Sequence, residues 1–441
     1  MDNFYHIVFI DFNYFQNTIN MMSLKNGKFD FARVDYLLLM CVMILLIVGA
    51  AIVYSASSFK AGQMPSGDSA YYFKNHMIRI MIGLLMMTVL IFIDFRICLG
   101  LSPILLSISV LLLLLLFTHS SFVVVKYGAA RWLKIGSFTF QPSDLARYAL
   151  ILVLARFLYQ DRESLDTWQG FLKKIGLVVV IAGLVAFEKD LGTALIIAII
   201  AFVMFFFAEV RLGYLLSIGL TILTASMIYL MSNDYMLKRV YTYIDSLFRK
   251  NISDYQLGQS LFSFHVGGLF GLGWGNSRQK YEFLPEAYKD FIFPIIGEEL
   301  GLLGTVVVLV LFFIIIYRGI QIAKTAPDGY GRLLAGGITV CIGIYAFFNA
   351  AVTLAILPTT GIPMPFISYG GSAMVTHLAA IGILINISAQ SNKSFMNYPS
   401  RSIYQNRMNR LSFSNKPANQ GKTGNRRKSK SRKQHKYRIV R

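Results

Sequence analysis

Five carboxylates fall within the twenty residues EFLPEAYKDFIFPIIGEELG, positions 282–301, of a chain that is 55% hydrophobic. Glu286 and Asp290 lead up to an apolar run, and Glu298 and Glu299 lie inside it. Acidic side chains are costly in a membrane segment and usually mark a pathway or a reaction site there. This stretch is therefore the first candidate for chemistry.

A structural interpretation of the same carboxylates is also open. Pro294 fits the first turn of a helix, which would then begin near Asp290–Phe293. Asp290 is a good N-cap there, because acids at a helix N-terminus are favoured by the macrodipole. Glu298 or Glu299 would then be paired inside a helix bundle. The residue types and their spacing leave both interpretations open.

Four more segments combine charge or glycine with the edge of an apolar run: YGAARWLKIGSFTFQPSDLARYAL (127–150), FEKDLGTALI (187–196), HVGGLFGLGWGNS (265–277) and LPTTGIPMPFISYGGS (357–372). Ordinary explanations exist, such as an interfacial Trp132 beside snorkelling Arg131 and Lys134. The last segment would interrupt a helix, which is tolerated at membrane depth only inside protein or beside a cavity. Together the five segments predict a polar cavity, open to the outer leaflet, for a substrate with a charged part and a lipid part.

The elements that position these residues follow from the composition. With 55% hydrophobic and 15% charged residues in 441, the chain has more apolar side chains than a soluble core can bury. Runs of roughly 20 such residues are long enough to cross a bilayer as helices. We predict an all-α polytopic membrane protein with ten spans, near 34–55, 75–94, 97–117, 142–159, 171–187, 191–208, 212–231, 291–317, 333–357 and 366–388.

The charge pattern orients these spans. From Ala389 onward there are 15 Lys and Arg and no acid, whereas the rest carries 27 basic and 22 acidic residues. An even number of spans and the positive-inside rule place both termini in the cytoplasm. We therefore expect a cytoplasmic segment at 1–33, a membrane domain at 34–389 with a large outer loop at 232–290, and a disordered basic tail at 390–441. The tail suits an anionic lipid surface better than a nucleic acid.

Several classes of chemistry find no motif in the sequence. There is no GxxxxGK[ST] loop and no GxGxxG after a strand, so nucleotide hydrolysis is not expected. The six histidines form no metal-binding spacing such as HExxH. Cys41, Cys98 and Cys341 lie in apolar segments, which is typical of buried thiols rather than disulfides.

The ordered motifs resemble the SEDS family (shape, elongation, division and sporulation) over residues 34–389. The resemblance rests on GAARWLKIG, QPSDLAR, DLGT, GGLFGLGWGNS, LPEAYKDFIF, GEELG and PTTGIPMPFISYGGS, in this order. The chain departs from the family where Lys189 replaces the usual Pro before DLGT. It departs again where Asp144 and Arg147 replace a Glu and a Lys of like charge.

The resemblance implies a glycosyltransferase of the bacterial cytoplasmic membrane that polymerises lipid II into the glycan strands of peptidoglycan on the outer face. Asp290 would be the general base that accepts a proton from the acceptor's 4-hydroxyl. Inversion would follow as undecaprenyl pyrophosphate leaves. The expected phosphate- and substrate-binding residues are Arg131, Trp132, Lys134, Arg239, Lys280 and Glu286. The expected supporting residues are Gln141, Ser143, Asp190, Gln256, Glu298, Glu299 and Ser368.

We expect Glu286, with Glu298 or Glu299, to organise the loop and helix around Asp290 rather than to transfer protons. Two carboxylates four residues apart in a helical turn would share a face, which raises one pKa unless a base such as Arg239 or Lys280 intervenes. The family also implies a class B penicillin-binding transpeptidase as partner. No resident cofactor is expected, and a divalent cation (Mg²⁺ or Mn²⁺) stays open as an assistant at the phosphates.

Two other functions would also use an intramembrane polar cavity. A lipid II transporter would need charges on the inner side as well, and the acids gather on the outer side. A non-catalytic scaffold would use the same residues only to bind the transpeptidase. The segment VYSASS (53–58) and the basic tail favour a role in division over one in elongation.

Overall fold

The computed structural model describes residues 30–391 except 66, 119–120, 127–128, 137, 233–236, 238–240 and 242–254. Nearly all of the expected basic tail and of the expected N-terminal segment lies outside these residues. Each of the ten predicted spans coincides with a helix. The helices of the first half are α3 (Tyr36–Gly62), α4 (Tyr71–Phe92), α5 (Phe95–Leu115), α6 (Pro142–Gln160) and α7 (Trp168–Phe187). Those of the second half are α8 (Leu191–Phe207), α9 (Leu212–Met231), α12 (Ile292–Thr325), α13 (Gly329–Thr353) and α14 (Ser372–Ala389).

Seven of the described helices are long and apolar enough to cross a membrane: α3, α4, α5, α7, α12, α13 and α14. Helix α8 is equally apolar but shorter, and α6 carries Asp144, Arg147 and Arg156 among its buried or half-buried residues. The prediction of an all-α polytopic membrane protein is confirmed. Cys41, Cys98 and Cys341 are buried free thiols, also as predicted.

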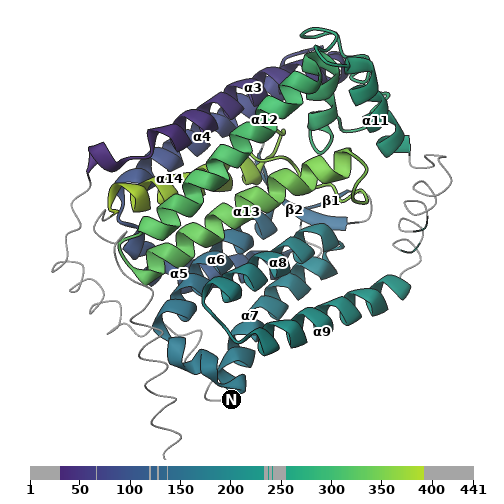
Figure 1. Ribbon diagram of the computed structural model, residues 1–441. Coiled ribbons are helices and arrows are strands. Elements are labelled where there is room, and N and C mark those ends of the chain that lie inside the picture. The colour runs from purple at the N-terminus through teal and green to yellow at the C-terminus, as the bar shows by residue number, and fades with distance from the viewer. Residues whose placement is uncertain are drawn as a thin grey trace, which may run out of the picture. The chain divides into compact units, whose positions relative to one another are not determined.

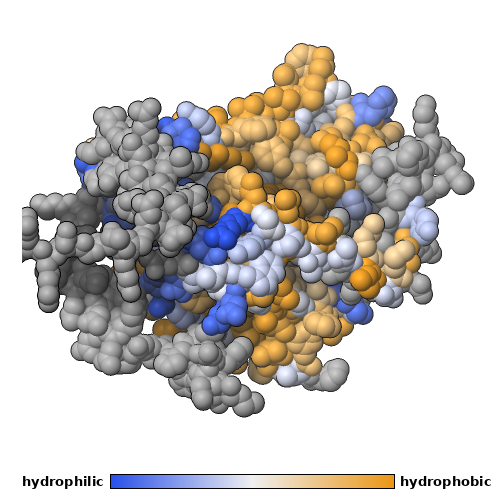
Figure 2. All heavy atoms as spheres, turned by 60° about the horizontal axis from the view of Figure 1, so that its bottom comes forward, coloured by the Kyte–Doolittle hydropathy of each residue, from blue (hydrophilic) through white to orange (hydrophobic). Residues whose placement is uncertain are grey.

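The helices form a bundle in which distant segments of the chain lie side by side. Helix α14 packs along α4, α12 packs against both α3 and α13, and α13 also contacts α6 and α8 (Figure 1). The inward-facing residues are Leu, Ile, Val, Phe and Ala in one continuous core. Large hydrophobic side chains remain exposed on the outside, and Figure 2 shows how widely they cover one face of the described surface. Such a surface is stable against lipid rather than water.

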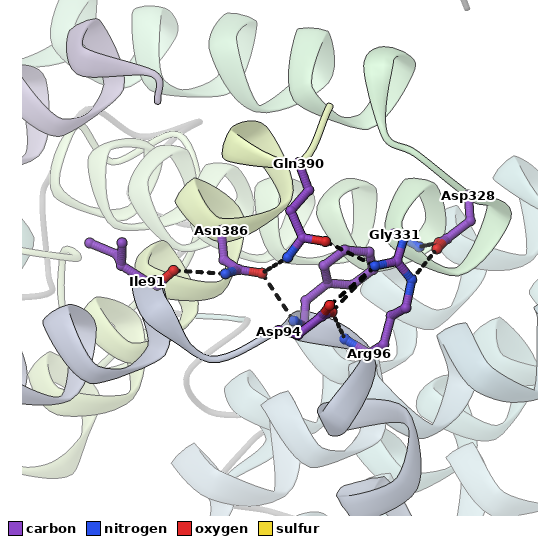
Figure 3. A network of polar contacts seen from close by, with 8 residues as sticks. Ile91, Asp94, Arg96, Asp328, Gly331, Asn386 and Gln390 are labelled. Atoms are coloured by element: carbon purple, nitrogen blue, oxygen red, sulfur yellow. Dashed lines mark hydrogen bonds and ion pairs between the residues drawn. The ribbon is translucent and has the colours of Figure 1, made fainter. Parts of the chain in front are cut away.

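One end of the bundle is held by a polar network around Arg96 (Figure 3). Its guanidinium lies 2.9 Å from a carboxylate oxygen of Asp328 and 3.2 Å from one of Asp94, and donates to the Gln390 amide oxygen at 2.9 Å. The Gln390 side chain in turn donates to Asn386 at 3.0 Å. These bonds tie the start of α5 to the start of α13 and the end of α14. The predicted site lies at the opposite ends of the same helices, here called the site end.

Two elements at the site end were not predicted. A three-stranded antiparallel sheet in the order β1–β2–β3 joins α5 to α6, with strands Val123–Lys126, Ala129–Ile135 and Phe138–Phe140. A helix α11 (Tyr255–Gly267) lies within the 232–290 loop. Strand β2 contains the ARWLK sequence, so the sheet rather than a helix end carries Arg131, Trp132 and Lys134.

Helix α12 is interrupted at Gly301, whose φ of 69° and ψ of −165° are outside the helical region. The segment 267–273 lies against this break and supplies backbone partners. Leu302 and Leu303 donate to the carbonyls of Gly268 and Leu269 at 2.9 and 3.2 Å. In the other direction, the carbonyls of Glu298 and Glu299 accept bonds from residues 272 and 273. Close backbone approach therefore explains Gly267 and Gly271, where an added Cβ would overlap a carbonyl of α12, and a positive φ explains Gly268 and Gly273.

We predict that Gly271→Ala destabilises the protein by roughly 1–3 kcal/mol more than Gly268→Ala. Both glycines have a positive φ, but a Cβ on Gly271 would overlap the Glu299 carbonyl, whereas one on Gly268 would meet open space. The measurement is thermal unfolding of both variants in detergent. Equal melting temperatures for the two variants would show that the close packing of this loop is not required.

Candidate active site

Asp290 lies just before α12, in a position suited to chemistry rather than capping. The N-cap of α12 is Phe291 and makes no side-chain capping bond, so the capping interpretation of Asp290 is wrong. Asn349 of α13 fixes the Asp290 backbone by donating to its carbonyl at 2.8 Å. A Cβ on Gly361 would lie 3.3 Å from an Asp290 carboxylate oxygen. The carboxylate itself is half-buried and accepts no hydrogen bond from the described residues, so it is available to a ligand.

The surroundings of Asp290 favour its protonated form more than water does. Burial is the main cause and raises its pKa to about 6, with Glu286 and Asp190 adding to the rise. Lys289 and Arg131 act in the opposite direction. A carboxylate with a pKa near the working pH is a better general base than an ordinary aspartate, and remains ionised at pH 7.

Glu286 lies between two lysines. Its carboxylate oxygens are 3.2 Å from Lys60 Nζ at the end of α3 and 2.5 Å from Lys289 Nζ in its own turn. Burial raises the pKa of Glu286, but these two ammonium groups outweigh burial and lower it. Lys60 and Lys289 are thus the bases that pair with Glu286. The suggestion of Lys280 for this role is wrong, since its ammonium donates to the Gly275 carbonyl in its own loop.

A second group of polar residues joins the sheet to the starts of α6 and α8. Arg131 donates to the carbonyls of Glu188 and Lys189 at the junction of α7 and α8. Gln141 at the start of α6 donates to the Asp190 carboxylate at 3.1 Å. That carboxylate also caps α8, since it accepts from the Thr193 backbone and hydroxyl at 3.2 and 3.0 Å. Three of the predicted residues, Arg131, Gln141 and Asp190, are thus brought together.

The segment after α13 connects this group to Asp290. A Cβ on Gly192 would lie 3.2 Å from Thr360 and 3.3 Å from Ile362. Gly361, between those two residues, faces Asp290. Through this contact Arg131 and Asp190 lie near enough to Asp290 to change its pKa: Asp190 raises the pKa and Arg131 lowers it. The site therefore combines the start of α8, the 357–371 segment and the turn before α12.

Glu298 and Glu299 bind the neighbouring loop rather than the Asp290 turn. Glu298 accepts bonds from the Ser277 hydroxyl at 2.5 Å and the backbone amides of Arg278 and Gln279 at 2.8 and 3.4 Å. Glu299 accepts from the Ser55 hydroxyl of α3 at 2.5 Å. Both carboxylates are fully buried, and charge-assisted bonds of this kind offset the cost of burying an acid.

The remaining predicted residues take varied places. Trp132 is half-buried and Lys134 exposed on β2, and Gln256 is half-buried on α11. The Ser368 hydroxyl, buried, accepts from the Met364 amide at 2.8 Å within the 357–371 segment. Ser143 is fully buried on α6. Arg239 lies outside the described residues.

Four residues near the site were not among the predicted site residues. Lys289 adjoins Asp290 in the chain, and its position three residues after Glu286 was a usable signal. Lys60 comes from a distant helix, so no local pattern could have identified it. Glu188 is almost fully buried, and burial together with the neighbouring Asp190 raises its pKa to about 9. Ser372, the first residue of α14, links this helix to the start of α6. Its hydroxyl accepts from the backbone N–H of Gln141 at 2.8 Å and donates to the Asp144 carboxylate at 2.6 Å.

The described residues offer no resident metal site. No group of three or more His, Cys, Asp or Glu side chains in this part of the chain is arranged to hold a metal ion.

The fold and site define a polytopic helical membrane protein with a polar site at one end of its bundle, built on the turn before a long interrupted helix. The family model for FtsW, RodA and SpoVE, described as "Cell cycle protein", matches residues 35–393. The chain belongs to this family, and the resemblance inferred from the motifs is confirmed.

Relatives of this chain carry names from the same family. The probable peptidoglycan glycosyltransferase FtsW of Trichlorobacter lovleyi is 37% identical over 84% of this chain and 97% of its own length. Stage V sporulation protein E of Bacillus subtilis is 36% identical over 81% of this chain and 97% of its own. A solved structure described as "Structural coordination of polymerization and crosslinking by a peptidoglycan synthase complex" is 25% identical, with a TM-score of 0.66 over 80% of this chain and 97% of that one.

We predict that Glu298→Gln loosens the loop that follows α11. An amide cannot accept from all three donors that meet this carboxylate, and each bond to a charged group contributes about 1.5–3 kcal/mol. Hydrogen exchange of the amides at 277–279 should therefore accelerate by about tenfold or more. Glu282→Gln, exposed on the same loop, is the matched control. Equal protection in the two variants would contradict the role given to Glu298.

Proposed function

We propose that this chain is a peptidoglycan glycosyltransferase that polymerises lipid II into glycan strands, with Asp290 as the general base. The observation that carries the proposal is the Asp290 carboxylate, half-buried, without a hydrogen-bond donor among the described residues and with a pKa raised to about 6. Family membership and relatives named as peptidoglycan glycosyltransferases support the reaction class.

In this reaction Asp290 accepts the proton of the acceptor sugar's 4-hydroxyl as that oxygen attacks the anomeric carbon of the donor. The bond from that carbon to undecaprenyl pyrophosphate breaks, so the configuration inverts and the pyrophosphate leaves with the electron pair. A general base contributes typically 10²–10⁴-fold. Positioning of the two sugars and stabilisation of the leaving pyrophosphate must supply the remainder.

Arg131 is the best candidate among the described residues for the developing charge on the pyrophosphate. It acts on Asp290 electrostatically and is fixed by the carbonyls at the α7–α8 junction. Its remaining guanidinium donors suit a phosphate oxygen. Lys134 is exposed on the same strand and fits a more peripheral role.

The orientation follows the charge distribution. With both termini in the cytoplasm, the site end faces outward, where the sugar and pyrophosphate of lipid II meet the hydrophobic interior that holds its lipid chain. The basic tail would then lie on anionic lipid at the other surface. A class B penicillin-binding transpeptidase is the proposed partner, because a similar solved structure concerns a synthase complex that couples polymerisation to crosslinking.

The direct experiment is purified protein with fluorescent lipid II, analysed on a gel that resolves glycan strands. We expect strands from the protein alone or with its transpeptidase partner. A transporter in proteoliposomes would move labelled lipid II between leaflets without elongating it. A scaffold would bind the transpeptidase and do neither, so each alternative predicts its own result.

The proposed role of Asp290 makes the reaction depend on pH. The base must be ionised, so kcat/KM for lipid II should rise with pH through about 6 and level off above it. The assay is the initial rate of strand formation between about pH 5 and 8, with unfolding monitored at each pH. A rate that stays constant down to pH 5 in folded protein would exclude a carboxylate base with this pKa.

A further inference from the structure

Lys60 is the last charged residue of α3 and contacts the Asp290 turn from outside it. We propose that Lys60 is a positioning residue, which holds the 284–291 turn against the end of α3 through Glu286 and thereby fixes the place and the electrostatic surroundings of Asp290. This inference rests on the proposed function, in which Asp290 is the base. Neither the motifs nor the comparisons assign a role to this lysine.

The turn has a shape that brings Glu286 to Lys60. Glu286 has a φ of 52°, a left-handed conformation that is uncommon for a residue other than glycine. The Lys289 amide closes the turn by donating to the Glu286 carbonyl at 2.9 Å. Glu286 then presents one carboxylate oxygen to Lys60 at 3.2 Å and the other to Lys289 at 2.5 Å. One carboxylate thus links α3 to the residue that precedes Asp290.

Aromatic contacts hold the same turn from two other directions. The Tyr288 ring lies 4.6 Å from the Tyr72 ring of α4 and 5.5 Å from the Tyr369 ring, measured between centroids. The Tyr369 amide also donates to the Tyr288 carbonyl at 3.0 Å. Lys60 Nζ lies 5.4 Å from the Tyr288 ring centroid. Tyr72 and Tyr369 are uncharged, so Lys60 is the residue among these contacts that brings a positive charge to the turn.

The charges that act on Asp290 give Lys60 a measurable effect. Lys289 and Glu286 come from its own turn, Asp190 from the start of α8, and Arg131 from strand β2. Glu286 favours the protonated form of Asp290, and Lys60 partly neutralises Glu286. Removing the Lys60 charge should therefore raise the pKa of Asp290, whereas removing the Glu286 charge should lower it.

The competing explanation is that the Lys60–Glu286 ion pair has no effect on Asp290 or on the reaction. The side chains of Lys60 and Glu286 are 36% and 27% exposed, and pairs with that much solvent often contribute little to stability. Stability alone would therefore not separate the two explanations. The pH dependence of the reaction does separate them, because a merely structural contact would not move it.

The experiment compares the pH dependence of kcat/KM for lipid II in Lys60→Met, Lys60→Arg, Glu286→Gln and the double variant Lys60→Met/Glu286→Gln. Lys74→Met is the matched control, because Lys74 forms an ion pair at 2.8 Å with Asp68, at the start of neighbouring α4. Met keeps the length and apolar character of the lysine stem, and Arg keeps the charge.

The acid limb is the part of the pH profile in which kcat/KM rises with pH. In Lys60→Met we expect the midpoint of this limb to move to higher pH by roughly 0.3–1 unit, the range for one charge at a partly solvated site. Glu286→Gln should move it down, and Lys60→Arg and Lys74→Met should match the wild type. In the Glu286→Gln background, Lys60→Met should have less than half of its effect, because Lys60 acts mainly through Glu286.

An unshifted acid limb in Lys60→Met would overturn the inference, whether or not the variant loses melting temperature or overall rate. An equal shift in Lys74→Met would overturn it as well, since any nearby lysine would then suffice. Failure of the proposed function would look different. In that case the wild type would form no strands, or would show no acid limb against which variants could be compared.

Discussion

The interruption of α12 at Gly301 imposes the constraint on which the site end of the molecule depends. Backbone N–H and C=O groups freed inside an apolar segment need partners that lipid cannot supply. Residues 267–273 supply them, and glycine is required at positions 267 and 271 because the two backbones approach so closely there. The carboxylates of Glu298 and Glu299 then bind the serines and amides around this contact. The long loop is thereby fixed to the helix that begins directly after Asp290.

With that loop fixed, three distant parts of the chain meet at Asp290. Asn349 of α13 holds its backbone, Gly361 leaves space beside its carboxylate, and Lys60 of α3 reaches its turn through Glu286. The start of α8 and strand β2 contribute Asp190 and Arg131 from the other side. The acids of the 282–301 stretch therefore divide into two kinds. Glu298 accepts three hydrogen bonds and Glu299 accepts two, whereas the Asp290 carboxylate accepts none from the described residues.

Local pattern was enough for the helices and for part of the site. Hydrophobic runs predicted the ten helices, seven of which are long and apolar enough to cross a membrane, because an apolar stretch of that length has few other stable conformations there. The motif order indicated Arg131, Gln141 and Asp190, which do come together. The strands β1–β3 escaped notice because they are short and lie in a loop. Lys60 could not be predicted, since its partner is 226 positions away and only packing brings them together. The alternative interpretation of Asp290 as a helix cap was wrong by one residue, because the N-cap is Phe291, and hydrophobic periodicity cannot place a helix end that finely.

The most direct measurement of the central claim is strand formation by Asp290→Asn, made together with lipid II binding and thermal unfolding in detergent. Asn has nearly the size of Asp but cannot accept the hydroxyl proton. The account predicts that polymerisation falls by at least about 10²-fold while lipid II binding and the melting temperature stay close to the wild type. Polymerisation at a near-normal rate in the Asn variant would contradict it.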